Sequence, residues 1–62
     1  MFIRAYHFYI IDREFGDAYH YYGNFATTAE VLRFMRENRA AGNTITALDC
    51  YHYEGDLANP LQ

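Results

Sequence analysis

The first pattern along the chain is a long, nearly continuous apolar stretch over residues 2–11. Aromatic and β-branched side chains fill this stretch, which predicts a β-strand of ten residues. Because apolar side chains occupy both faces of the strand, we expect it to lie at the centre of a sheet. The charged residues 12–17 then break the pattern, and Gly16 can adopt the positive φ that a hairpin connection of this length often needs.

Residues 18–25 predict the returning strand of the hairpin, weakened near its end by Gly23 and Asn24. A helical pattern begins after this strand. Thr27 and Glu30 have the spacing of a capping box ahead of an apolar run, which predicts a helix start. The apolar positions that recur at helical spacing, and that we expect to form one buried stripe, are Val31, Leu32, Phe34, Met35 and Ala41.

The predicted helix covers residues 28–41, since Gly42 followed by Asn43 is typical of a left-handed helix end. Residues 44–53 are again rich in β-forming side chains and predict a third strand. The tail over residues 54–62 has few apolar side chains, so we expect it to be loose or to lie along an edge.

The order strand, strand, helix, strand predicts an α+β domain of ββαβ type over residues 1–62. The hairpin makes the first two strands antiparallel, and the helix carries the chain back to the end where the second strand began. The third strand then runs antiparallel to the first. A sheet order of 2-1-3 satisfies these directions and places the most apolar strand in the centre. The domain therefore has two layers, with one helix on one face of a three-stranded sheet.

Side chains alternate between the two faces of a strand, so the uncovered face carries large rings whichever way the sheet is turned. We expect Tyr6, Phe8 and Ile10 to point toward the helix, with Ile3, His7, Tyr9 and Ile11 on the opposite face. Each predicted strand also contains a Tyr-His-aromatic triplet, at residues 6–8, 19–21 and 51–53. Alternation predicts that the aromatic rings of these triplets share one face and their imidazoles the other.

The seven tyrosines are more than a small two-layer domain can bury. Tyrosine is enriched at binding surfaces because it combines contact area with a polar group. The structural alternative is that cross-strand aromatic pairs stabilise a small sheet. The tyrosines that we expect to contact a partner are Tyr9, Tyr22, Tyr51 and Tyr53.

The net charge is −3, with five arginines and no lysine, which argues against binding of nucleic-acid phosphates. An acidic chain suits a basic protein surface, although solubility alone also accounts for a charge of this size. The expected acidic contacts form two groups at opposite ends of the sheet: Asp12, Glu14 and Asp17, and then Glu54 and Asp56.

Catalytic and metal chemistry find little support in the sequence. The three histidines lack short ligand spacings, and no serine or phosphate-binding glycine loop occurs. Cys50 and His52 point to the same side of one predicted strand, but we expect Cys50 to be a small buried residue. We therefore expect no enzyme activity, cofactor or metal. A single cysteine and the lack of any membrane-length apolar run predict a reducing, cytoplasmic setting.

In size, acidic charge and ββαβ architecture, the chain resembles the small phage and mobile-element inhibitors of the anti-CRISPR type. That resemblance implies a non-enzymatic inhibitor that occupies a surface of a basic or nucleic-acid-handling protein. It includes no residue-level signature, so it assigns no functional residue. An antitoxin-like neutralising subunit or a self-associating regulatory domain is the alternative, and the chain is expected to be a monomer or a homodimer.

Overall fold

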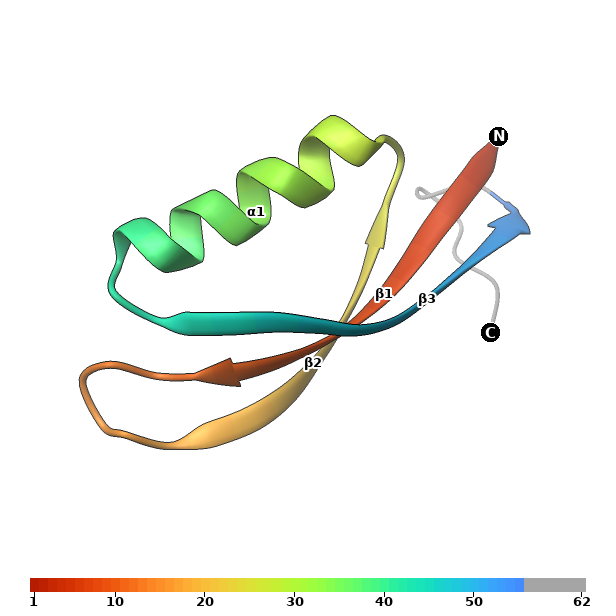
Figure 1. Ribbon diagram of the computed structural model, residues 1–62. Coiled ribbons are helices and arrows are strands. Elements are labelled where there is room, and N and C mark those ends of the chain that lie inside the picture. Colours follow the sequence, from red (N-terminus) through yellow and green to blue (C-terminus); the bar gives the residue numbers. More distant parts are fainter. Residues whose placement is uncertain (56–62) are drawn as a thin grey trace.

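The computed structural model describes residues 1–55, which form three strands and one helix (Figure 1). Strands β1 (Phe2–Ile11) and β2 (Ala18–Phe25) form a long twisted hairpin, helix α1 (Thr28–Ala40) follows, and β3 (Thr44–Glu54) completes the sheet. The strand order is β2-β1-β3, and β1 is antiparallel to both neighbours. The predicted ββαβ order and α+β class are confirmed. The expectation of a loose tail concerns residues that lie, from position 56 on, outside the described part of the chain.

The hairpin connection is organised by Asp12. Its Oδ1 atom accepts hydrogen bonds from the backbone N–H groups of Glu14 and Phe15, both at 2.9 Å. Gly16 has a φ of 69° and donates its N–H to the Asp12 carbonyl at 2.9 Å. The loop thus depends on an acidic side chain and on a residue that tolerates positive φ.

Helix α1 begins at the predicted N-cap. The Thr27 hydroxyl accepts the N–H of Glu30 at 3.2 Å, as a capping box requires. The Glu30 carboxylate, however, accepts the N–H of Ala26 at 3.3 Å, one residue before the N-cap. Because Ala26 also accepts a 2.7 Å hydrogen bond from the Arg4 guanidinium, this corner joins β1, β2 and the helix.

The helix ends in a Schellman arrangement at Gly42, which has a φ of 89°. The N–H of Gly42 bonds the Arg39 carbonyl at 2.9 Å, and that of Asn43 bonds the Asn38 carbonyl at 2.9 Å. Asn43 also accepts the Arg13 N–H at 3.0 Å, so the helix end is tied to the hairpin loop. No helix within residues 1–55 has the length and apolar character needed to cross a membrane.

The core lies between α1 and one face of the sheet, around Phe8, Ile10, Val31 and Ile45. The prediction that Tyr6, Phe8 and Ile10 point toward the helix is confirmed, since Tyr6 packs against this cluster. The predicted helical stripe was too wide: Leu32 is 53% exposed, and Ala41 is exposed as well. Leu32 lies about 100° around the helix from Val31, beyond the stripe that one face of a three-stranded sheet covers.

A β-bulge at Leu48 changes the side-chain phase of β3. Phe8 is paired with Ala47 and His7 with Asp49, so Leu48 has no partner on β1. The Asp49 carboxylate accepts the Cys50 N–H at 2.8 Å within this irregularity. Beyond the bulge every side chain of β3 lies on the opposite face from the one that simple alternation predicts.

Candidate functional site

The face of the sheet opposite α1 is called here the uncovered face, and it gathers tyrosines from all three strands. Alternation and strand register place on it the four tyrosines that the sequence nominated: Tyr9, Tyr22, Tyr51 and Tyr53. Tyr22 is 71% exposed, Tyr51 is 64% exposed and Tyr9 is 36% exposed, whereas Tyr53 is half-buried. Tyr22 and Tyr51 are therefore the rings of this set that are most available to another molecule.

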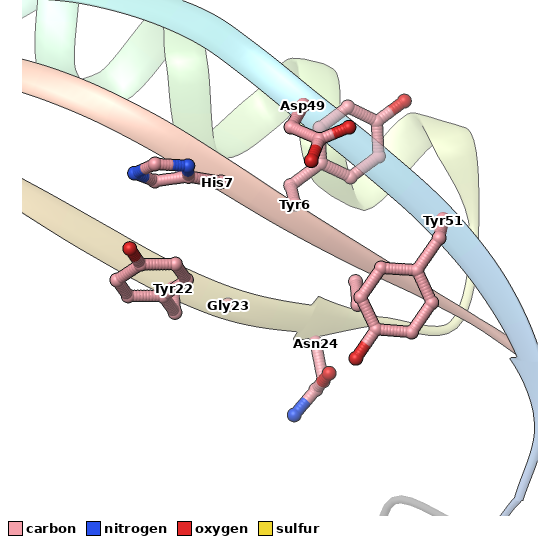
Figure 2. Close-up of a pocket in the computed structure, with 8 residues that line it drawn as sticks. Tyr6, His7, Tyr22, Gly23, Asn24, Asp49 and Tyr51 are labelled. Atoms are coloured by element: carbon pink, nitrogen blue, oxygen red, sulfur yellow. The ribbon is translucent and has the colours of Figure 1, made fainter.

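A hollow of about 260 Å³ opens on the uncovered face above Ala5 (Figure 2). Ala5 is paired with Asn24 on β2 and with Tyr51 on β3, and His7 follows it on the same face of β1. Because the Ala5 side chain ends at Cβ while its neighbours are long, the middle of the face is left empty. The residues that line the hollow are Ala5, Tyr6, His7, Tyr22, Gly23, Asn24, Asp49 and Tyr51.

Two sets of rings form the walls of this hollow. On the β2 side, Tyr22 stacks on His7 with ring centroids 4.3 Å apart and an interplanar angle of 13°. Figure 2 shows the Tyr51 ring extending from β3 over the hollow, with its hydroxyl on the Asn24 side. Tyr53 lies 5.8 Å from Tyr51 between ring centroids, and its hydroxyl donates to Asn24 Oδ1 at 3.1 Å. Two tyrosines thus reach from one edge strand toward the other.

Two histidines contact each other beside the hollow. The Nε2 atom of His7 is 2.6 Å from the Nδ1 atom of His20, and the Tyr9 ring meets His20 edge-on at 5.3 Å. His52 lies on the other face, because the bulge reverses the third Tyr-His-aromatic triplet. The prediction that all imidazoles share one face and all their flanking rings the other is therefore wrong for β3.

The uncovered face carries one formal charge within the described residues, that of Asp49. The Arg4 guanidinium bonds the Ala26 carbonyl on the helix side, and the Arg13 side chain lies against Gly42. The remaining three arginines belong to α1. Since no arginine reaches the face and the chain has no lysine, its fixed charge is negative.

Of the predicted acidic groups, the structure describes four residues, none of which is on the uncovered face. Asp12, Glu14 and Asp17 lie at the hairpin loop, where the Asp12 carboxylate is occupied by two backbone N–H groups. Glu54, at the end of β3, pairs with the amino group of Met1 at 3.1 Å. Asp56 lies outside the described residues. The acidic residue that does lie among the rings, Asp49, was not nominated from the sequence.

The remaining reactive groups do not converge. Within residues 1–55, no three His, Cys, Asp or Glu side chains are grouped so that they could hold a metal ion. Cys50 is exposed, which corrects the expectation that it is buried; it is paired with Tyr6 at the edge strand. A side-chain hydrogen bond with Cys50, together with burial, raises the pKa of Tyr6.

Ala5 and Asn24 were also missed by the sequence reasoning. One signal for Ala5 was present, since it is the single small residue in the bulky stretch over residues 2–11. Asn24 gave no such signal, because its importance depends on Tyr53 reaching it from a strand far along the chain.

No protein-family model, curated protein or solved structure matches this chain. The function is therefore inferred from the geometry and chemistry of the uncovered face.

Proposed function

We propose that this protein is a small non-enzymatic inhibitor that binds a basic, nucleic-acid-handling protein through the uncovered face of its sheet. The observation that carries the proposal is the grouping of exposed rings from three strands around one carboxylate, with no arginine among them. Tyrosine-rich surfaces of this kind provide contact area at low entropic cost.

A basic protein fits this face better than a nucleic acid does. Binding of single strands combines base stacking with neutralisation of phosphates by lysine or arginine. The exposed rings could stack on bases, but the described face carries the negative charge of Asp49 and no fixed positive charge that could neutralise phosphates. Lysine and arginine side chains of a protein partner meet both the rings and the carboxylate favourably.

The net charge of −3 adds long-range attraction to a basic partner. The acidic hairpin loop, with Asp12, Glu14 and Asp17, lies at one end of the sheet and can contact the rim of such an interface. Covering a basic surface blocks the nucleic acid that it would otherwise bind, which is how the inhibition would arise. The single unpaired cysteine suits a cytoplasmic setting.

The test compares capture of host proteins by the wild-type chain, by the double variant Tyr9→Ser/Tyr22→Ser, and by the control Leu32→Ser. Leu32 is exposed on the helix layer, so its replacement changes an apolar side chain away from the face. We expect the wild type and the control to retain a basic protein and the double variant to lose it. Purified, that protein should bind nucleic acid less well when the wild-type chain is added.

Raising the salt from about 0.1 M to about 0.5 M should weaken the complex, because exposed charges are then screened. Charge reversal at Glu14 and Asp17 should slow association more than it speeds dissociation, and Asp12 is kept because its carboxylate organises the loop. A partner retained equally by the double variant would overturn the proposal. The self-associating alternative would instead be supported if the particle mass doubles as the protein concentration rises and returns to that of the monomer in the double variant.

A further inference from the structure

We infer that the hollow above Ala5 is a receptor for one arginine side chain of the partner protein. The inference rests on the proposed function and specifies the contact at its centre. An arginine receptor needs a cavity that opens to solvent, aromatic walls and a carboxylate, and the described residues provide all three. It also needs a site without a competing positive charge, and no arginine of the described residues lies on this face.

The walls suit a flat cation. One side of the Tyr22 ring is occupied by His7 at 4.3 Å, yet Tyr22 remains 71% exposed, so its other side is open. Tyr51 is 64% exposed and extends over the hollow from the opposite strand (Figure 2). The faces of aromatic rings attract cations, and arginine stacks on them more readily than lysine because its guanidinium is planar and weakly hydrated.

The rim of the hollow supplies hydrogen-bond acceptors. Oδ1 of Asp49 accepts the Cys50 N–H at 2.8 Å, which fixes the carboxylate and leaves its second oxygen free to accept. Across the hollow, Oδ1 of Asn24 accepts the Tyr53 hydroxyl at 3.1 Å, so this oxygen is held in position with a second lone pair. A guanidinium has five N–H donors in a fixed fork and can bond acceptors on two sides, whereas an ammonium is a compact point charge.

The position of the hollow also agrees with a central anchor. It lies on β1, the middle strand, between the two edge strands that carry the exposed rings. Interfaces commonly concentrate their binding energy in one arginine or aromatic anchor that fills a pocket and is surrounded by weaker contacts. Tyr9 and Tyr53, on either side of the hollow along the strands, would form part of that surround.

The test is an NMR titration of the full chain with N-acetyl-arginine amide. The backbone amides of Ala5, Asn24, Asp49 and Tyr51 should shift and saturate at roughly millimolar concentrations, as expected for so small a ligand. The neutral analogue N-acetyl-citrulline amide has nearly the same shape and should cause no saturable shift. N-acetyl-lysine amide should bind about fivefold more weakly, which is the scale of a solvent-exposed stacking contact.

Two variants separate the hollow from the rest of the face. Ala5→Ile fills the hollow with a side chain that favours strands, so the variant should fold and lose arginine binding. Asp49→Asn keeps the side-chain shape and should weaken binding by up to about fivefold, the upper end for an exposed ion pair. Leu32→Ser, on the helix layer and away from the uncovered face, should leave arginine binding unchanged, which makes it the control.

Citrulline binding equal to that of arginine, or unchanged arginine binding by folded Ala5→Ile, would overturn the inference. Tighter binding of a short oligouridylate than of the arginine probe, on the same amides, would also overturn it and indicate a nucleic acid instead. The proposed function has a separate outcome: if arginine does not bind while Tyr9→Ser/Tyr22→Ser still abolishes capture of a basic protein, the face binds its partner without an arginine in the hollow.

Discussion

The Nε2 atom of His7 lies 2.6 Å from the Nδ1 atom of His20, and this hydrogen bond joins β1 to β2 on the uncovered face. One ring must donate and the other must accept, so the pair holds a single proton between its two nitrogens. We expect a double-mutant cycle with His7→Ala and His20→Ala to give a favourable coupling of roughly 0.5–1.5 kcal/mol near neutral pH.

The coupling is measured by urea unfolding of the wild type, the two single variants and the double variant at about pH 7.5. The rings of Tyr9 and Tyr22 and the carboxylate of Asp49, which is paired with His7 on β3, also face the pair. A coupling indistinguishable from zero would contradict a hydrogen bond between the two rings.

Deletion of Leu48 should move the side chains at the end of β3 to the opposite faces of the sheet. Without the bulge, alternation carries Tyr51 and Tyr53 to the helix side, so the Tyr53 hydroxyl can no longer reach Asn24. The deletion variant should lose the NMR contacts between the Tyr53 ring and Asn24 and should no longer bind N-acetyl-arginine amide. Leu48→Ala, which keeps the extra residue, is the control and should retain both. If the deletion variant keeps the Tyr53 contacts, another residue of β3 forms a bulge in place of Leu48 and the prediction is wrong.

Gly23→Ala should destabilise the fold by roughly 1–3 kcal/mol through overpacking. A Cβ at this position would lie 2.9 Å from ring atoms of both Tyr21 and Phe25. Those rings cannot easily retreat, because both pack against Phe34, at 5.0 Å and 5.6 Å between centroids. Gly16→Asn is the contrasting control. Gly16 has a φ of 69°, which asparagine tolerates, and a Cβ added there would have no heavy atom within 4 Å apart from those of its chain neighbours. Thermal unfolding should separate the two, and equal costs would contradict the steric explanation.

Alkaline conditions should destabilise the fold partly through Tyr6. The hydrogen bond with Cys50, desolvation and the charge of a Cys50 thiolate raise the pKa of Tyr6 above its ordinary value of 10.0. As pH rises past that value, the unfolded chain loses the phenolic proton first, so the free energy of unfolding falls. Tyr6→Phe should therefore lose less stability than the wild type between about pH 9 and about pH 11.

Tyr22→Phe is the control for this experiment, since it removes one hydroxyl from an exposed ring. Its alkaline loss should match that of the wild type. If Tyr6→Phe also loses stability as steeply as the wild type, the Tyr6 hydroxyl does not contribute to the alkaline transition.

The elements of this fold follow from local sequence patterns. The apolar stretch over residues 2–11, the capping pair Thr27 and Glu30, and the glycine at position 42 mark where strands and helix begin and end. Such signals depend on side-chain periodicity and backbone conformations that neighbouring residues set by themselves. Strand order followed from them, because few arrangements satisfy short connections and one central apolar strand.

The width of the buried helical stripe could not be predicted from the sequence pattern alone. Leu32 is apolar and next to Val31, yet only Val31 is buried. A helix pattern shows which side chains are apolar, while the shape of the opposing surface decides how many of them it covers. One face of a three-stranded sheet contacts a narrow stripe of the helix, so Leu32 stays in solvent.

The sequence by itself thus determined the order of strands and helix and the central place of β1, and it favoured but did not fix the side of β1 that meets the helix. Only the tertiary structure decided what the other face contains. The bulge at Leu48 arises from the pairing of β3 with β1, and it brings Asp49 and Tyr51 beside the hollow over Ala5. Alternation is a local property of each strand, but its phase relative to a neighbour depends on register, and one extra residue reverses it.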